Sequence, residues 1–188
     1  MPLKPNQIFD GTVNLEYFSK ISEKWNINLI DTGQKTMTGG RVKRLQKFIG
    51  KETCMLTYGD GLSDVDITST IKFHQQHGKQ ATVTATYPPA RFGKLNIKDG
   101  VVTDFTEKPK GEGTLINGGF FVLSPEVLKK ITGDDCLWEK TPLVELTKEK
   151  ELMAYEHYGF WQPMDTLHDK NVLEALWQSG KAPWKNWE

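Results

Sequence analysis

The fold prediction starts from the stretch CMLTYGDG, residues 54–61. Its apolar first half is typical of a buried strand, and the strand ends at an acid, Asp60, that stands between two glycines. In open α/β sheets, ligands bind beyond the carboxyl ends of the strands, so a carboxylate there is well placed to hold Mg²⁺ against phosphate oxygens. The flanking glycines would let a phosphate approach the backbone. The alternative is an ordinary turn whose Asp caps the next helix.

Strand and helix patterns alternate on both sides of this stretch. The segments are, in order, WNINLID (25–31, strand), RVKRLQKFI (41–49, helix), CMLTY (54–58, strand), ITSTIKFHQQH (67–77, helix) and ATVTATY (81–87, strand). The helices follow from apolar residues at a spacing of three to four, and the strands from alternation or β-branched content. This order predicts a parallel, doubly wound sheet for the first half of the chain.

The second half has a different pattern. Asp99-Gly100 stands between two alternating runs, which predicts a β-hairpin. The later segments are GTLINGGFFVL (113–123, strand), PEVLKKI (125–131, helix), TPLVELTKEK (141–150, helix), LMAYEHYG (152–159, strand) and HDKNVLEALWQSG (168–180, helix). We therefore predict an α/β protein with a Rossmann-like, doubly wound mixed sheet. Because no repeat or linker interrupts the chain, we expect a single domain over 1–188, with an irregular segment at 1–24 and a core at 25–188.

Composition narrows the function classes. Lys+Arg and Asp+Glu number 24 each in 188 residues, so the net charge is zero and there is no basic footprint for nucleic acid. No apolar run has the length of a membrane span, and the N-terminus has no apolar signal core. The two cysteines, Cys54 and Cys136, suggest neither a disulfide framework nor a zinc site, which makes the cytoplasm the expected compartment.

Two further stretches of the first half could bind a nucleotide or a metal. Asp64-Val65-Asp66 has the DxD pattern of many glycosyltransferases, although the cap of a helix explains it equally well. The loop MTGGR, residues 37–41, leads into a helix, and backbone N–H groups of Gly39 and Gly40 could face a nucleotide. An ordinary loop is the alternative, since the spacing of a Walker A motif is absent.

In the second half, candidate ligand contacts follow or interrupt strands. Lys108 in EKPKGEG could place a point charge on a sugar phosphate, or could belong to a solvated charge run. Gly118-Gly119 inside a strand suggests close approach of a ligand, with a β-bulge as the alternative, and Asn117 could bind sugar hydroxyls.

The stretch GFWQPMDT, residues 159–166, supplies the last candidates. Asp165 could be a second metal carboxylate or a loop residue that starts the final helix, and Trp161 could stack on a ligand or be buried. The four histidines, His74, His77, His157 and His168, form no ligand-spaced cluster and are interpreted as structural or exposed.

Taken together and in order, six stretches carry a family resemblance. They are TGQKTMTGGRVKR, LTYGDG, ATYPPARFGKL, FTEKPKGEG, INGGFFVL and GFWQPMDT. The combination resembles the sugar-1-phosphate nucleotidylyltransferases, and within them the members that use CTP and glucose 1-phosphate. The resemblance extends from about residue 25 to the C-terminus and implies the nucleotide-diphospho-sugar transferase type of Rossmann-like fold.

The resemblance also implies roles for individual residues. Around the nucleotide base and ribose it places Thr38, Gly39, Gly40 and Arg41; around the sugar phosphate, Gly93, Glu107, Lys108, Asn117, Gly118 and Trp161; on Mg²⁺, Asp60 and Asp165. Of these, Asp60, Lys108 and Asp165 are the residues expected to act in catalysis. The implied reaction is Mg²⁺-dependent transfer of CMP from CTP to glucose 1-phosphate, giving CDP-glucose and pyrophosphate for bacterial surface polysaccharides such as the lipopolysaccharide O-antigen. The implied assembly is a homo-oligomer, without nucleic-acid or membrane partners.

One departure from the family pattern keeps alternatives open. Family members begin with a strand and a GGxGTR-type loop that holds the triphosphate, and the sequence contains no such loop. We therefore expect an N-terminally truncated member whose activity alone is impaired. The first alternative is a non-catalytic sugar-phosphate binding or assembly module, and the second is a DxD glycosyltransferase that uses Asp64 and Asp66.

Overall fold

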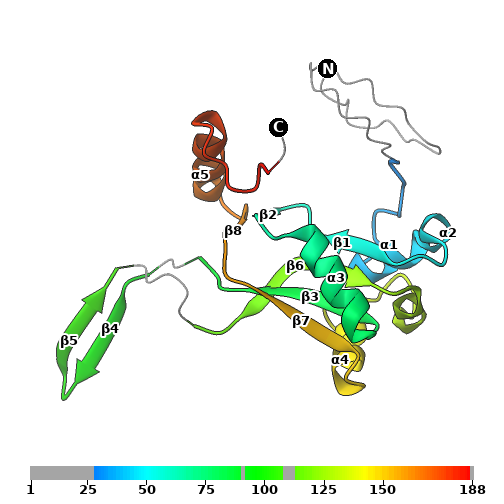
Figure 1. Ribbon diagram of the computed structural model, residues 1–188, viewed down its shortest axis with the longest axis horizontal. Coiled ribbons are helices and arrows are strands. Elements are labelled where there is room, and N and C mark those ends of the chain that lie inside the picture. Colours follow the sequence, from blue (N-terminus) through cyan, green and yellow to red (C-terminus); the bar gives the residue numbers. More distant parts are fainter. Residues whose placement is uncertain (1–27, 90–91, 108–112, 187–188) are drawn as a thin grey trace. The chain divides into compact units, whose positions relative to one another are not determined.

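The computed structural model describes residues 28–89, 92–107 and 113–186 (Figure 1). These residues fall into two compact units. One comprises the described residues up to Gly50 together with Leu128–Glu145, and the other comprises those of Lys51–Val127 and Leu146–Glu188. Among the helices of the described residues, none is long and apolar enough to cross a membrane.

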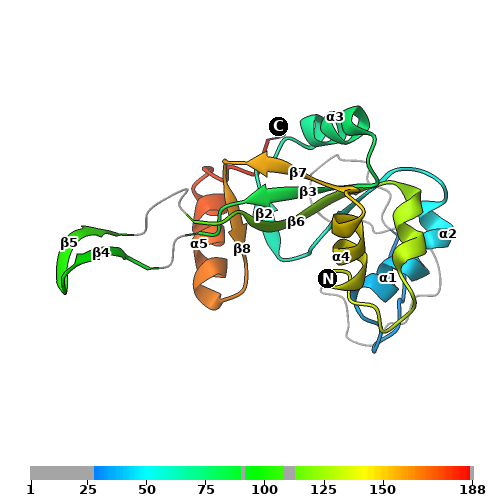
Figure 2. The same cartoon turned by 90° about the horizontal axis from the view of Figure 1, so that it is seen from below.

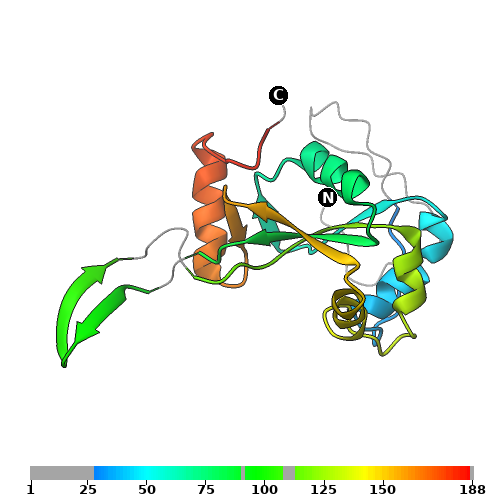
Figure 3. The same cartoon turned by 60° about the horizontal axis from the view of Figure 1, so that its bottom comes forward.

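A four-stranded mixed sheet forms the centre of the larger unit. Its strands, in spatial order, are β1 (Cys54–Thr57), β6 (Ile116–Leu123), β3 (Ala81–Thr86) and β7 (Leu152–His157) (Figure 3). β6 runs antiparallel to both β1 and β3, whereas β3 and β7 are parallel. The predicted mixed sheet is confirmed, with one correction to the parallel first half: β1 and β3 are not neighbours, because β6 lies between them.

Helix α3 (Ile67–His77) packs on this sheet (Figure 1). Asp66 begins the helix, since its Oδ1 accepts a hydrogen bond from the Ser69 N–H at 2.9 Å, and Gly78 ends it with a left-handed φ of 64°. The core of the sheet consists of β3 and β6 side chains with almost no exposure, among them Ala81, Phe121 and Val122. Burial of this apolar surface is the main stabilising term.

Two smaller two-stranded sheets complete the larger unit. β2 (Gly61–Ser63) pairs antiparallel with β8 (Trp161–Pro163), and α5 (Leu167–Gln178) follows β8 (Figure 3). β4 (Lys94–Lys98) and β5 (Val101–Thr106) form the predicted hairpin, with Asp99 and Gly100 both at positive φ in its turn (Figure 2). A positive φ at both turn positions suits the right-handed twist of the paired strands.

The smaller unit contains α1 (Thr38–Arg44), α2 (Gln46–Ile49) and the start of α4 (Thr141–Lys148). A six-residue 3₁₀ helix, η1 (Pro125–Lys130), crosses the boundary between the units. The buried side chains of the smaller unit include the apolar residues Val42, Leu128, Ile131, Cys136 and Trp138.

The strand predicted over 25–31 is not found in its described part, 28–31, which has no regular structure. No strand occurs among the described residues of the smaller unit, so this alternating segment has no neighbour with which to pair. The helix predicted over 41–49 begins earlier, at Thr38, and is divided at Leu45 into α1 and α2.

Candidate functional site

Asp60 lies in the turn that joins β1 to β2, at the carboxyl end of β1. Its side chain is exposed, and its backbone carbonyl accepts a hydrogen bond from the N–H of Met164 at 2.7 Å. The acid does not cap α3, because Asp66 does so. The capping alternative for Asp60 is therefore excluded, and its carboxylate lies at the exposed end of a central strand.

Asp165 lies two residues after the end of β8 and is also exposed. The alternative that Asp165 starts the final helix does not hold, because Thr166 is the cap of α5: its hydroxyl accepts from the Asp169 N–H, while Asp169 accepts in turn from Thr166. Gly61 pairs with Pro163 in the β2–β8 ladder, and the Met164 N–H binds the Asp60 carbonyl one step further. This register brings the backbones of Asp60 and Asp165 to neighbouring positions.

The donor set of these two acids suits a magnesium ion. Mg²⁺ prefers oxygen ligands and is usually held by one or two carboxylates, with water and substrate phosphates completing its shell. Within the described ranges, no group of three or more His, Cys, Asp or Glu side chains could hold a metal. Two exposed carboxylates on adjacent strand ends therefore fit a phosphate-bound Mg²⁺ better than a cage built by the protein alone.

The backbone conformation does not require glycine at either of the positions that flank Asp60. Neither Gly59 nor Gly61 has a positive φ. A Cβ at Gly59 would meet nothing within 4 Å, and a Cβ at Gly61 would meet only the Trp161 indole nitrogen at 3.9 Å and the Gly118 carbonyl at 4.0 Å. A plain turn would accept larger residues at both positions, so the space around Asp60 is not required by the turn itself.

Three of the predicted sugar-phosphate residues lie together beside this strand end. The Trp161 indole N–H donates to the Gly118 carbonyl at 2.7 Å, so β8 is tied to β6. The side-chain carbonyl of Asn117 accepts from the Gly119 N–H at 2.8 Å, and its amide donates to the Tyr58 hydroxyl at 3.3 Å. Asn117 and Trp161 therefore lie next to the residues that flank Asp60.

The Gly118-Gly119 pair has its own structural explanation. Gly119 has a φ of 79°, and a Cβ there would lie 2.7 Å from the Tyr58 ring. Gly118 is buried, and a Cβ there would lie 3.0 Å from the Thr84 carbonyl. The pairing of β3 with β6 shifts in register at this point, so the bulge alternative is realised. Tyr58, which the sequence interpretation passed over, is the aromatic residue that packs on this bulge; its position just before Gly-Asp-Gly was the available signal.

Gly93 and Glu107 come together at the base of the β4–β5 hairpin. A Cβ at Gly93 would lie 2.6 Å from the Phe105 ring and 3.0 Å from a carboxylate oxygen of Glu107. Gly93 therefore allows the two strand ends to approach closely. Lys108, the next predicted residue, lies outside the described residues.

The glycines of the predicted nucleotide loop pack against backbone of their own unit. The Gly40 N–H donates to the Cys136 carbonyl at 3.2 Å, and Met37 N–H donates to Asp134 at 2.8 Å. A Cβ at Gly39 would lie 2.8 Å from the Cys136 carbonyl, and one at Gly40 would lie 2.7 Å from that of Asp134. These glycines are needed for close packing, and the Gly40 N–H is engaged within the chain.

Thr38 and Arg41 also make contacts within this unit. The Thr38 hydroxyl donates to Glu139 at 2.9 Å and accepts from the Trp138 N–H at 2.9 Å. The Arg41 guanidinium donates to the Thr32 hydroxyl at 2.7 Å, and both Thr38 and Arg41 are exposed. Arg41 also donates to the Gln34 carbonyl at 3.4 Å, so both side chains are held in place at the surface.

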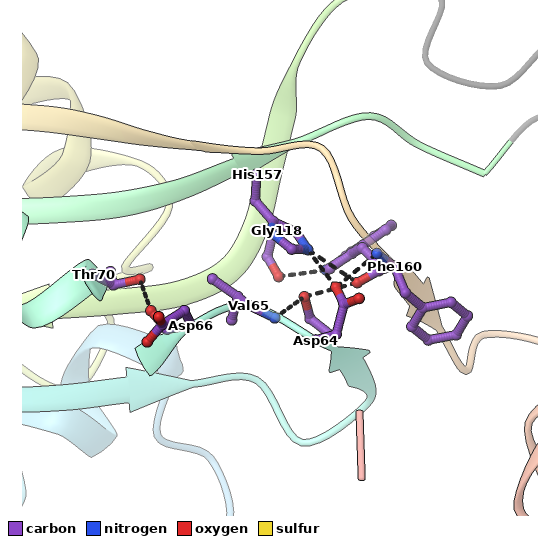
Figure 4. Close-up of polar contacts among 9 residues, drawn as sticks. Asp64, Val65, Asp66, Thr70, Gly118, His157 and Phe160 are labelled. Atoms are coloured by element: carbon purple, nitrogen blue, oxygen red, sulfur yellow. Dashed lines mark hydrogen bonds and ion pairs between the residues drawn. The ribbon is translucent and has the colours of Figure 1, made fainter. Parts of the chain in front are cut away.

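The two acids of the DxD pattern point to different parts of the larger unit (Figure 4). Asp64 accepts from the Phe160 N–H at 2.7 Å and lies 2.9 Å from His157 Nε2. Asp66 accepts from both the N–H and the hydroxyl of Ser69, and these hydrogen bonds hold the pKa of its carboxyl below the ordinary value. Both carboxylates serve the fold, which does not favour a metal site of the glycosyltransferase type.

Two of the histidines are structural, as expected. His74 is buried, with its two ring nitrogens near the hydroxyls of Thr82 at 2.9 Å and Ser124 at 3.1 Å. His77 accepts from the Lys79 N–H on Nδ1, so its Nε2 carries the proton toward Thr82. Burial lowers the pKa of both imidazoles, and each therefore stays neutral to lower pH than a free histidine.

The chain is similar to known proteins in both sequence and fold. The family described as Nucleotidyl transferase matches residues 12–165. The chain is 57% identical over 175 residues to glucose-1-phosphate cytidylyltransferase of Salmonella typhimurium and equally to that of Salmonella typhi; in each case the match covers 93% of this chain and 68% of the relative. The crystal structure of HddC from Yersinia pseudotuberculosis is similar with a TM-score of 0.53 and 19% identity, over 74% of this chain and 61% of that one, which bears on the fold alone. The chain belongs to the nucleotidyl transferase family.

Proposed function

We propose that this chain carries the metal and sugar-phosphate parts of a glucose-1-phosphate cytidylyltransferase. The observation that carries the proposal is the β2–β8 register, in which Asp60 and Asp165 occupy neighbouring positions beside Asn117 and Trp161. The activity of the two Salmonella relatives, as their names state it, supports the substrate assignment. We also propose that the protein is cytoplasmic and that it uses Mg²⁺.

The reaction is a displacement at phosphorus. A phosphate oxygen of glucose 1-phosphate forms a bond to the α-phosphorus of CTP, and the bond from that phosphorus to the bridging oxygen breaks, so pyrophosphate leaves with the electron pair. When bound, Mg²⁺ supplies neutralisation of the phosphate charge. Asp60 and Asp165 would hold it. No covalent bond to the protein is required, so positioning and charge are the protein's contribution.

Other side chains position the two substrates. The Glu107 carboxylate and the Asn117 amide can hydrogen-bond sugar hydroxyls, and the Lys108 ammonium can pair with the sugar phosphate. Arg41 provides guanidinium donors for the nucleotide. Gly118 acts indirectly, since its carbonyl orients the Trp161 indole beside the strand end.

Substitution of Asp60 tests the metal assignment. Asp60→Asn keeps the shape of the side chain and removes a charge that repels the Asp165 carboxylate, so we expect an unchanged or slightly higher stability of the metal-free protein. Mg²⁺-dependent binding of CTP, measured by calorimetry, should be lost. A lower stability of about 1 kcal/mol, with metal-dependent binding retained, would return Asp60 to the role of a turn residue.

A second candidate function is a binding module without turnover. It is favoured by the Gly40 N–H, which is engaged by the Cys136 carbonyl, because preorganised phosphate contacts contribute several kcal/mol to catalysis in such enzymes. On this basis we expect the chain alone to turn over CTP and glucose 1-phosphate slowly or not at all, and to bind glucose 1-phosphate more tightly than CTP. A pyrophosphate-release assay and paired titrations check both expectations. Turnover equal to that of a Salmonella relative would dismiss this candidate.

We also propose that the chain assembles with copies of itself. The apolar side chains of Leu95, Ile97, Val102 and Phe105 are 50%, 62%, 51% and 59% exposed. Leu95 pairs with Phe105 and Ile97 with Val102, and residues opposite one another in a hairpin share a face. An apolar face of this kind on a two-stranded hairpin supports a covering partner, because such hairpins are marginal in water.

A further inference from the structure

The ladder between β2 and β8 is too short to fix its own register. It contains three residue pairs, Gly61 with Pro163, Leu62 with Gln162, and Ser63 with Trp161. Pro163 has no backbone N–H and cannot donate a hydrogen bond to the ladder. Contacts at the two ends of the ladder must therefore determine which residues of the strands lie opposite each other.

At the end nearer Ser63, the Asp64 carboxylate holds the turn that joins β7 to β8 (Figure 4). One of its oxygens accepts from the Phe160 N–H at 2.7 Å and lies 2.9 Å from His157 Nε2. The Asp64 N–H donates to the Phe160 carbonyl at 3.2 Å. Gly159 leaves the carboxylate its space, since a Cβ there would lie 2.5 Å from the Asp64 oxygen. Hydrogen bonds to both the backbone N–H and the backbone carbonyl of Phe160 thus hold this residue in place.

At the other end, the Met164 N–H donates to the Asp60 carbonyl at 2.7 Å, and Asp165 is the next residue. Four residues, 161–164, therefore separate Phe160, which Asp64 contacts, from Asp165, the candidate metal carboxylate. A strand advances about 3.3 Å per residue, and a slip of one residue turns every side chain to the opposite face. Such a slip would change the position of Asp165 relative to Asp60, which lies opposite Met164 in the observed register.

We propose that Asp64 is a positioning residue that sets the register of β8 against β2 and so keeps Asp165 next to Asp60. The inference rests on the proposed function in one respect, namely that these two acids share a metal. Asp64 itself is not assigned as a ligand, because its near oxygen is already engaged by Phe160 and His157 and its side chain is 34% exposed. Asp64, the first acid of the DxD pattern, thus acts on the metal site indirectly, because it sets the position of the strand that leads to Asp165.

The test compares Asp64→Ala with Asp66→Ala in the full chain. Each variant removes one Asp that accepts a backbone N–H, but Asp66 serves the cap of α3 and not the ladder. Amide hydrogen exchange of Met164, followed by NMR, reports the far end of the ladder without any ligand. We expect Asp64→Ala to speed this exchange at least tenfold and Asp66→Ala to change it less than twofold. Asp64→Asn keeps an acceptor for the Phe160 N–H and should recover most of the protection.

Binding of Mg²⁺ in the presence of CTP, measured by calorimetry, is the second readout. It should weaken at least tenfold in Asp64→Ala and stay within twofold in Asp66→Ala. Equal Met164 exchange in the two variants would overturn the inference, as would weaker Mg²⁺ binding with unchanged exchange, which identifies Asp64 as a direct ligand. If the unsubstituted chain binds no Mg²⁺ with CTP, the proposed function fails, while the exchange data still decide the role of Asp64.

Should Asp64→Ala fail to fold, His157→Gln provides a milder variant, because it weakens only part of the contact. Faster Met164 exchange in this variant than in Asp66→Ala supports the inference. Exchange equal to that of Asp66→Ala overturns it.

Discussion

At the scale of single residues, the glycines around Asp60 differ in what they do for the chain. Gly119 needs its positive φ of 79°, and the Tyr58 ring fills the place of a side chain. Gly59 needs neither a special φ nor a close approach. Residue type alone cannot separate these cases, since Gly59 and Gly119 look alike in the sequence.

Gly119→Ala should destabilise the protein strongly. An L-residue in left-handed backbone costs about 1–2 kcal/mol, and overpacking against a ring adds about 1–3 kcal/mol. We therefore expect a loss of roughly 2–5 kcal/mol in the free energy of unfolding, measured with urea. The matched control Gly59→Ala should change this free energy by less than about 0.5 kcal/mol. Similar losses in both variants would show that the Tyr58 contact is unimportant.

Gly59→Ala and Gly61→Ala should instead affect the ligand. Because neither Cβ would meet anything closer than 3.9 Å, the fold accepts both substitutions. If a phosphate-bound metal approaches this backbone, each added methyl group takes up part of the space, and Mg²⁺-dependent CTP binding should weaken about tenfold. Calorimetry on the folded variants measures this effect. If the affinity for CTP with Mg²⁺ is unchanged in both variants, the two glycines do not contribute to the metal site.

At the scale of elements, we expect the attachment of α3 to β3 to depend on pH. His74 and His77 contact the Thr82 hydroxyl on β3, and burial lowers the pKa of both imidazoles. Smaller effects on His77 come from Glu151, which raises its pKa, and Lys79, which lowers it. A lowered folded-state pKa means that the unfolded chain binds protons first, so stability is complete above the unfolded value of about 6.5 and falls as the pH decreases below it.

We expect the free energy of unfolding in urea to be lower at pH 5.5 than at pH 7.5. In His77→Gln, which keeps a polar side chain without titrating in this range, the decrease should be smaller. If the free energy of unfolding decreases as steeply in this variant as in the unsubstituted chain, groups other than His77 cause the pH dependence. The same comparison with His168→Gln, which replaces an exposed histidine on α5, serves as the control.

The elements also show how far the sequence could be interpreted. The strand before Asp60, the hairpin at Asp99-Gly100 and the cap at Asp66 were predictable, because each depends on residues close together in the chain. The place of β6 between β1 and β3 was not, since the spatial order of strands is set by tertiary packing. The close packing of Gly39 and Gly40 against the distant 134–136 segment was hidden for the same reason.

In the candidate site too, single residues could be predicted from the sequence, whereas their contacts with distant residues could not. Asp60 and Asp165 could each be named from their positions at element ends, but their proximity depends on a three-residue ladder that leaves no periodic pattern in sequence. The role of Asp64 was equally inaccessible, because its partners Phe160 and His157 lie about 95 residues further along the chain. Tyr58 was missed although it stands next to Gly59.

At the scale of the whole molecule, the exposed face of the β4–β5 hairpin predicts association. The double substitution Leu95→Lys with Phe105→Lys places two charges on this face, and sedimentation should shift to smaller species. Asn96→Lys, on the opposite face of the same strand, is the matched control and should sediment like the unsubstituted chain. An unsubstituted chain that sediments as a monomer at micromolar concentration contradicts the proposed assembly.

The insertion of β6 between β1 and β3 has a consequence for synthesis on the ribosome. β1 ends at Thr57, while its sheet partner β6 begins only at Ile116, so roughly sixty residues must be translated before β1 can pair. At about 5–20 residues per second, this takes roughly 3–12 seconds. During that interval the emerging chain carries an unpaired strand with Cys54 and Leu56 uncovered. We therefore expect nascent chains stalled before residue 116 to be bound by chaperones and those stalled well beyond residue 123 to be released.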